Sequence, residues 1–275
     1  MNKRPTNDEA TSQAALETVM RRCPLAEETN TVWADKDGER LVVYLPHYIR
    51  QRTADELMAK LDDVVKKSSG SIPKDQHRFS NVSERAGGMA QPRMVLEFTV
   101  RQPQGHRNET PAISRDFVRT CKGAQAIAGL FTSEAYESLV RTLSIVLCAL
   151  DEKKWKQVRT RVEQTKKLDP LWALEQRCGI QCFVSLFILC NVFSGPHFDV
   201  RDVPDGWAAM VVLGEHKDGH LYLPDVHASL PYRTRDVVFF RAALLDHFSS
   251  VFEGKRYVLV FTNSQQLFEY LERFA

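Results

Sequence analysis

The segment Ser194-Gly-Pro-His-Phe-Asp199 decides how the rest of the chain is interpreted. It holds an imidazole, His197, and a carboxylate, Asp199, two positions apart. In an extended strand, residues i and i+2 point to the same side, so both side chains can converge on one cation. Such a pair also arises by chance at a protein surface. The segment therefore predicts a metal site only if the chain supplies further ligands.

A second segment supplies them. Leu244-Leu-Asp-His-Phe-Ser-Ser-Val-Phe252 contains His247, and Arg256 follows this histidine by nine residues. Two histidines and one carboxylate form the facial triad of non-haem iron(II) oxygenases, which leaves positions open for a co-substrate and oxygen. Glu253-Gly-Lys255 predicts a turn, so that Arg256 opens the next strand. A guanidinium near such a site can bind a carboxylate through two hydrogen bonds, and 2-oxoglutarate carries a distal carboxylate that fits this role.

Both segments lie in a β-rich half of the chain that begins near Cys182. Short β-branched and aromatic runs alternate there with turns, in the order CFVSLFILCNVF, GWAAMVVLG, HLYLP, ASLPY, DVVFF and RYVLVFT. Several short strands at this spacing predict a sandwich or a barrel. Further elements are predicted as a hairpin over 31–46, a strand over 94–100, and helices over 53–67, 133–150, 151–168 and 265–274. The economical interpretation is an α+β fold with one catalytic domain and a helical N-terminal support.

The composition of the chain limits its functional class. It has 275 residues, is 43% hydrophobic and 26% charged, and has a formal net charge of +2. No apolar run reaches the roughly 18 residues that a membrane span needs, so we expect no membrane partner. The small positive charge neither requires nor excludes a nucleic-acid partner, because binding depends on where charges cluster. The oligomeric state is left open.

The β-rich half resembles the TET/JBP branch of 2-oxoglutarate dioxygenases, especially its fungal and protist members. The matching motifs are HFDVRD over 197–202, GHLYLP over 219–224, Tyr232-x-x-x-Asp-Val-Val-Phe-Phe-Arg241, His247, and GKRYVLVF over 254–261. Upstream, VWADKDGERLVVYLP over 32–46 looks like the strand pair that opens protist members.

The resemblance implies a double-stranded β-helix (jelly-roll) core over about 180–263. It lies within one domain over 31–275, after a polar N-terminal segment over 1–30. It also implies oxidation of the methyl group of a methylated DNA base, with Fe(II) and 2-oxoglutarate as cofactors. His197, Asp199 and His247 match the iron ligands, and Arg256 matches the arginine for the distal carboxylate of 2-oxoglutarate. Asp202 matches an acidic residue that contacts the target base; an ordinary loop aspartate is the alternative.

The chain departs from the branch at two positions. Protist members carry an arginine five residues before the first histidine, where this chain has Val192. Asn191-Val-Phe193 instead resembles the Asn-x-Tyr of the AlkB branch, so we expect Asn191 to hydrogen-bond the co-substrate. The base-contacting histidine beyond the last strand has no match. Asn263 or Ser264 stands nearby, and Asn263 is the candidate substrate contact.

The substrate expected from these residues is 5-methylcytosine in DNA, oxidised to 5-hydroxymethylcytosine, with further oxidation left open. A carboxylate at Asp202 can accept a hydrogen bond from the exocyclic amine of cytosine. Adenine also carries such an amine, so N6-methyladenine is the alternative base. A base in a duplex must be flipped out to reach a buried metal, and we expect the protein to be nuclear.

Two basic regions are candidates for contact with DNA. The loop Gln104–Asn108, with Arg107 and Asn108, is expected to face the substrate, with an ordinary polar loop as the alternative. The lysine- and arginine-rich helix over 151–168 is interpreted first as a solvated face. The main rival function is a 2-oxoglutarate hydroxylase of a protein side chain or a small metabolite, which would share every iron residue.

Overall fold

The computed structural model describes residues 13–68, 70, 72, 92–101, 109–118, 120–168, 172–173 and 181–274. Its helices are α1 Gln13–Arg22, α2 Gln51–Lys67, α4 Cys121–Phe131, α5 Glu134–Leu150, α6 Glu152–Thr165 and α8 Gln265–Phe274, with short 3-10 turns at Arg115–Phe117 and Pro224–Val226. The strands are β1 Thr31–Ala34, β2 Arg40–Leu45, β3 Met94–Arg101, β4 Ala112–Ile113, β5 Ser185–Cys190, β6 Ala208–Asp218, β7 Leu221–Leu223, β8 Ala228–Leu230, β9 Val237–Phe240, β10 Phe248–Ser249 and β11 Phe252–Thr262.

An eight-stranded sheet forms the centre of the molecule, with the strand order β1-β2-β9-β6-β11-β5-β3-β4. Its neighbouring strands pair antiparallel, including the long ladder between β6 and β11. Both faces of its central strands are buried. In β11, Leu259 and Phe261 belong to one core cluster, whereas Val258 and Val260 belong to another. Because successive side chains point to opposite faces, a strand buried on both sides must be apolar at consecutive positions.

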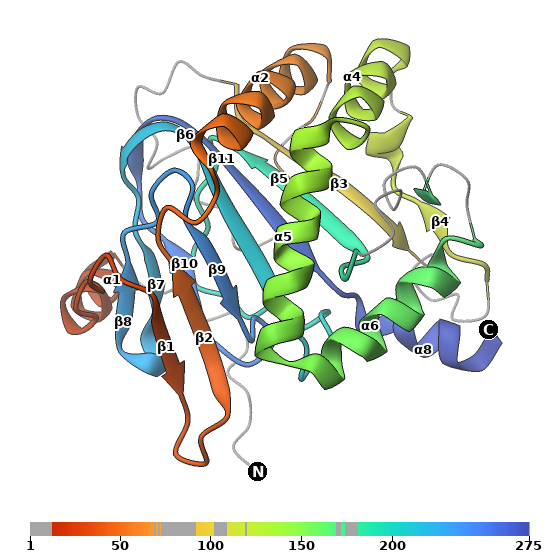
Figure 1. Cartoon of the computed structure of the whole chain (residues 1–275). Coiled ribbons are helices and arrows are strands. Elements are labelled where there is room, and N and C mark those ends of the chain that lie inside the picture. The colour runs from red at the N-terminus through yellow and green to blue at the C-terminus, as the bar shows by residue number, and fades with distance from the viewer. Residues whose placement is uncertain are drawn as a thin grey trace.

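Helices cover one face of this sheet. Figure 1 shows α2, α4, α5 and α6 in front of the large sheet. Buried residues of these helices, such as Leu57, Leu61, Leu139 and Leu143, pack in one cluster with Leu259 of β11. Helical packing therefore buries the outer face of the sheet, and the opposite face is left to form the second core.

A small sheet covers that opposite face. It has the order β10-β7-β8, and its Leu223 and Leu230 pack in one cluster with Met210 and Val258 of the large sheet. Two antiparallel sheets that face each other form the predicted jelly-roll core, with helices outside it, so the α+β fold class is confirmed. Helix α1 packs outside the small sheet, where Leu16 is clustered with Tyr222 and Phe248.

Two local predictions have different outcomes. The hairpin at 31–46 is confirmed, since β1 and β2 pair antiparallel and Gly38 has a positive φ of 84° in their connection. The helix predicted over 53–67 begins two residues earlier, at Gln51, after Arg50, which makes no side-chain cap. Thr53 therefore lies inside α2, where the side chain of Glu56 accepts a hydrogen bond from Arg52.

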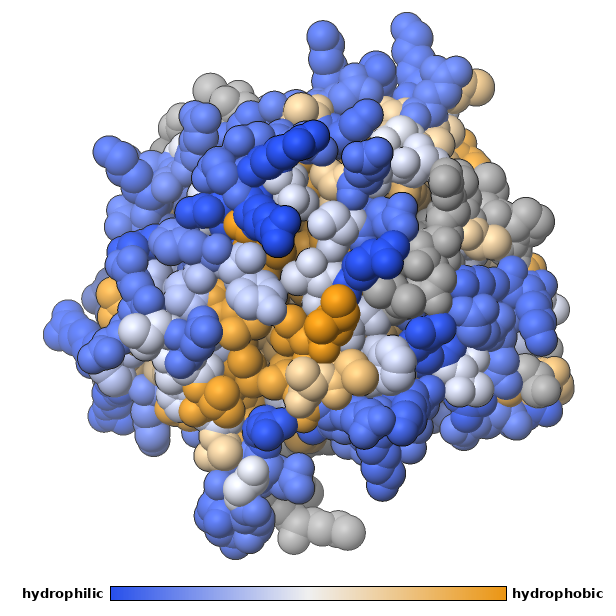
Figure 2. Space-filling view, in the orientation of Figure 1, coloured by the Kyte–Doolittle hydropathy of each residue, from blue (hydrophilic) through white to orange (hydrophobic). Residues whose placement is uncertain are grey.

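The face shown in Figure 2 carries apolar surface in its middle, where Figure 1 places α5 and the strands beside it. A hollow of about 410 Å³ lies between α5 and the start of α2, lined by residues that include Tyr48, Leu139 and Ile145. In the part of the chain that is described, no helix is long and apolar enough to cross a membrane.

Replacing Gly214 by alanine is expected to lower the free energy of unfolding by more than about 1 kcal/mol, because its backbone cannot accept a side chain without strain. Gly214 lies opposite Arg256 in the β6–β11 ladder, has a φ of +116°, and would place a Cβ 2.2 Å from the Lys255 carbonyl oxygen. Urea unfolding measures the change.

Gly129→Ala is the matched control. This glycine lies within α4 with nothing within 4 Å of an added Cβ, so alanine should stabilise by up to about 1 kcal/mol. Equal stability of Gly214→Ala and the wild type would contradict the proposed backbone constraint.

Candidate metal centre

Two segments that are distant in sequence meet at His197 and His247. The backbone N–H of His197 donates to the carbonyl oxygen of His247 at 3.1 Å, and the N–H of His247 donates back at 3.0 Å. This reciprocal pair forms an antiparallel bridge. Asp199 joins the same crossing, because its N–H donates to the Ala242 carbonyl at 3.0 Å. The backbone therefore brings together all three residues that the sequence predicts as ligands.

Their side chains form a cluster that can hold a metal ion. Ligand atoms of His197, Asp199 and His247 all lie within 4.8 Å of one another. The two Nε2 atoms are each 3.7 Å from a carboxylate oxygen of Asp199, and the imidazole ring centres are 4.2 Å apart. The expected i, i+2 arrangement and the distant third residue thus converge at one point.

Backbone carbonyls orient both imidazoles. The Nδ1 atom of His197 lies 2.8 Å from the Gly195 oxygen, and that of His247 lies 3.0 Å from the Leu245 oxygen. A carbonyl oxygen can only accept, so each Nδ1 carries the proton and each Nε2 keeps its lone pair for a metal. His197 is 6% exposed and His247 only 1% exposed, which limits the access of water to this centre.

Arg256 is a buried cation on β11. It is 1% exposed, and its Nη1 donates to the Gly219 carbonyl at 2.7 Å. Its guanidinium carbon lies 3.8 Å from the ring centre of Phe252. No ion pair links it to a carboxylate among the described residues, and burial lowers its pKa to about 10. The predicted turn at 253–255 is wrong, because these residues pair with β6 inside β11.

The surroundings of Arg256 include groups that the sequence alone did not identify. Tyr232 has a positive φ of 57°, and its ring centre lies 5.4 Å from the guanidinium carbon of Arg256. Its hydroxyl donates to the Met210 sulfur at 3.0 Å. Gly219 has no Cβ at the point where one would lie 2.2 Å from Arg256 Nη1. The glycine in the GHLYLP motif was the available signal, since a bare backbone often marks a close approach.

The carboxamides of Asn191 and Asn263 are bonded to the backbone. Asn191 accepts from the Arg256 N–H at 2.9 Å and donates to the Pro92 carbonyl at 2.9 Å. Asn263 accepts from the Val184 N–H at 3.0 Å and donates to the Cys182 carbonyl at 3.3 Å. Both side chains therefore bond segments that flank β3, β5 and β11, and their expected contacts with co-substrate and substrate stay predictions.

Asp202 lies three residues after the ligand Asp199 and is half-buried. Its N–H donates to the Asp199 carbonyl at 2.9 Å, and its backbone bridges Ser264. The structure thus places it in the loop next to the candidate metal ligands, and its contact with a base stays a prediction. Arg107 and Asn108, the other expected substrate residues, lie outside the described residues.

The basic helix α6 carries mostly paired charges. Ion pairs involve three of its cations, through Lys154–Asp205, Lys156–Glu152 and Arg161–Glu272, and the adjoining Lys166 pairs with Glu163. Paired surface charges of this kind contribute little attraction to a distant polyanion. They favour the interpretation of α6 as a solvated face over that of a nucleic-acid surface.

Comparisons with known proteins bear on the fold. No protein-family model matches the chain, and no curated protein matches it. NgTET1 in complex with 5mC DNA superposes with a TM-score of 0.58 at 15% identity, covering 92% of this chain and 91% of that one. A Pseudomonas putida prolyl-4-hydroxylase gives a TM-score of 0.46 at 12% identity, over 82% and 92% of the chains. The first likeness shows that the chain shares the fold of the NgTET1 structure.

His247→Ala is expected to abolish stoichiometric binding of a divalent metal while the protein stays folded, because an aspartate and one histidine hold the ion poorly. Titration calorimetry with Fe(II) under anaerobic conditions measures binding, and circular dichroism checks folding. The control is His227→Asn, at an exposed position with a φ of +51° that asparagine tolerates. Wild-type metal affinity in folded His247→Ala protein would exclude this histidine as a ligand.

Proposed function

We propose that this chain is an Fe(II)- and 2-oxoglutarate-dependent dioxygenase that oxidises the methyl group of 5-methylcytosine in DNA. The observation that carries the proposal is the occurrence, in one jelly-roll core, of the His197–Asp199–His247 cluster and a buried guanidinium with no carboxylate partner among the described residues. Either feature alone is compatible with many functions. Together they match the needs of one reaction class.

The donor set of the cluster fits iron(II). Two imidazoles and one carboxylate bind first-row metals and leave positions open for other ligands. Bound iron(II) supplies the activation of dioxygen. The protein orients the imidazoles through the carbonyls of Gly195 and Leu245 and excludes water by burying both histidines. The edge of Phe240 lies against His247, with ring centres 4.8 Å apart, and adds an apolar wall.

Arg256 fits the distal carboxylate of 2-oxoglutarate. A buried charge without a partner is costly, and an anionic ligand would supply the missing charge. Gly219 and Val192 accept hydrogen bonds from its guanidinium through their carbonyls, at 2.7 and 3.5 Å, and hold it in place. The 2-oxoglutarate would then reach from this guanidinium to the metal cluster with its keto acid end.

Asp202 supports a cytosine substrate. A carboxylate there can accept a hydrogen bond from the exocyclic amine of the base, which thymine lacks. The likeness to a structure of NgTET1 with 5mC DNA supports the same substrate class. N6-methyladenine is the alternative base, and the proposal includes flipping of the base and a nuclear location. A hydroxylase of a protein side chain or metabolite is the rival, because the same iron residues would serve it.

Mass spectrometry of nucleosides tests the proposal directly. The protein is incubated with Fe(II), 2-oxoglutarate and duplexes that carry 5-methylcytosine, N6-methyladenine or no modification. We expect 5-hydroxymethylcytosine from the first duplex and a large loss of this product in Asp202→Ala, with metal and 2-oxoglutarate binding retained. Succinate formation without oxidation of any DNA base, together with oxidation of a peptide or metabolite, would support the rival.

Arg256→Ala is expected to weaken 2-oxoglutarate binding roughly a hundredfold or more, since losing one partner of a buried charge pair costs about 3–5 kcal/mol. The requirement for DNA should change far less. Calorimetric titration of the metal-loaded protein with 2-oxoglutarate measures the effect. Arg141→Ala is the control, because Arg141 forms an exposed ion pair with Glu137 on α5. Equal affinity in both variants would remove Arg256 from the co-substrate site.

A further inference from the structure

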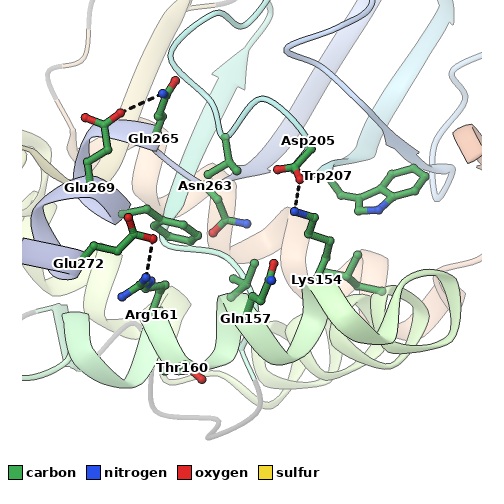
Figure 3. A pocket seen from close by; sticks show the side chains of 15 residues that line it. Lys154, Gln157, Thr160, Arg161, Asp205, Trp207, Asn263, Gln265, Glu269 and Glu272 are labelled. Carbon is green, nitrogen blue, oxygen red and sulfur yellow. Dashed lines mark hydrogen bonds and ion pairs between the residues drawn. The ribbon is translucent and has the colours of Figure 1, made fainter. Parts of the chain in front are cut away.

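The loop between the ligand Asp199 and strand β6 has a hollow behind it. A pocket of about 500 Å³ lies between α6, α8 and this loop, and Figure 3 shows Asp205, Trp207 and Asn263 at its wall. The loop residues Val203, Asp205 and Gly206 line the pocket. Core packing therefore does not support this side of the loop, and polar contacts must hold it.

Two of these contacts come from the consecutive residues Arg241 and Ala242. Near one end of the loop, the Asp199 N–H donates to the Ala242 carbonyl at 3.0 Å. Near the other end, Nη1 of Arg241 donates to the Asp205 carbonyl. Asp202 lies between these two attachments. The backbone around Asp202 is also bonded to the segment after β11, through Val203 N–H to the Asn263 carbonyl at 2.8 Å and Gln265 N–H to the Arg201 carbonyl at 3.0 Å. The position of Arg241 therefore contributes to the distance of Asp202 from His197, Asp199 and His247, together with this backbone bridge.

A buried ion pair fixes Arg241. Its Nη2 lies 3.1 Å from Asp151 Oδ2, and the Trp207 Nε1–H donates to the same oxygen at 3.2 Å. The guanidinium carbon lies 4.1 Å from the ring centre of Trp207. The side chains of Arg241 and Asp151 are only 10% and 19% exposed. Burial alone would raise the pKa of Asp151, but hydrogen bonds from Lys154, Trp207 and Arg241 lower it overall, so the carboxylate stays charged.

A second ion pair reaches the same loop from its exposed side. Figure 3 shows Lys154 of α6 directed at Asp205 across the pocket. The Asp205 side chain is 67% exposed, and exposed pairs contribute little. The two contacts to Asp205 thus form a natural comparison, with one buried and the other solvated.

We infer that Arg241, held by Asp151, is a positioning residue that sets where Asp202 lies relative to the metal ligands. It thereby couples the consumption of 2-oxoglutarate to oxidation of the substrate. The inference rests on the proposed function. The contacts given for the side chains of Arg241 and Asp151 do not include His197, Asp199, His247 or Arg256, so both should act on the substrate step alone.

Asp151→Asn and Arg241→Lys test this role conservatively. Asparagine caps a helix about as well as aspartate, so the first variant keeps the oxygen that caps α6. It removes the charge and replaces the oxygen that accepts from Trp207 and Arg241 by an NH2 group, which cannot accept. The second keeps the charge but loses the planar guanidinium. Lys154→Ala removes the exposed contact and is the control. Succinate and 5-hydroxymethylcytosine are measured in the same reaction on a 5-methylcytosine duplex.

We expect the product formed per succinate to fall roughly tenfold or more in Asp151→Asn and Arg241→Lys, because a displacement of about 1 Å can cost about a hundredfold in rate. Fe(II) and 2-oxoglutarate affinities should stay within about twofold of wild type, a change worth less than about 0.5 kcal/mol. Lys154→Ala should keep the wild-type ratio. Hydrogen exchange of the Asp202, Val203 and Gly206 amides should accelerate only in the first two variants.

The outcomes separate the inference from the proposed function. An unchanged product ratio or unchanged amide exchange in folded Asp151→Asn and Arg241→Lys overturns the positioning role. A parallel loss of metal affinity overturns it as well, since the defect would then be general. If the wild-type protein forms no succinate, or forms succinate without oxidised base, the proposed function fails instead, and the role in coupling fails with it.

Discussion

The reciprocal backbone hydrogen bonds between His197 and His247 are the constraint on which the site depends. In a closely spaced antiparallel pair, the two side chains stand next to each other on one face. The main chain therefore places both imidazoles, and Asp199 follows because it lies two residues along the same segment. Side-chain contacts then refine the arrangement, as the carbonyls of Gly195 and Leu245 select the nitrogen that faces the metal.

The large sheet places different chemistry on its two faces. On the helical face, Lys255 binds Asp62 of α2 at 2.9 Å, and the hydroxyl of Tyr257 donates to the same carboxylate. Arg256 lies between these two residues and points to the opposite face. The helical layer thus anchors β11 from outside, and the interior receives the guanidinium. If the pairing of β11 shifted by one residue, Arg256 would point to the helical face, and Lys255 and Tyr257 would point to the interior.

The residue pattern was sufficient to predict a sandwich or a barrel, the order of most helices and strands, and the three residues of the metal cluster, and the family resemblance added that the core is a jelly roll. These features depend on local periodicity and on side-chain chemistry that few other patterns share. The turn predicted at 253–255 was wrong because these residues pair with β6, a strand distant in sequence. The contacts of Tyr232 and Arg241 were not predictable, since each depends on a segment distant in sequence. The family resemblance predicted that Asn191 contacts the co-substrate and that Asn263 contacts the substrate. The sequence could not show that both carboxamides are hydrogen-bonded to the backbone.

Arg256, whose positive charge meets no carboxylate among the described residues, also has a thermodynamic consequence. Burying a cation without a nearby anion lowers the free energy of unfolding of the ligand-free protein. An anion that binds only the folded protein restores it by RT ln(1 + [L]/Kd), which is about 2.7 kcal/mol at a hundredfold excess over Kd. The lifetime of the folded chain would then follow the supply of this anion. The amount of folded protein, as well as its catalytic rate, would then depend on the cellular concentration of this anion.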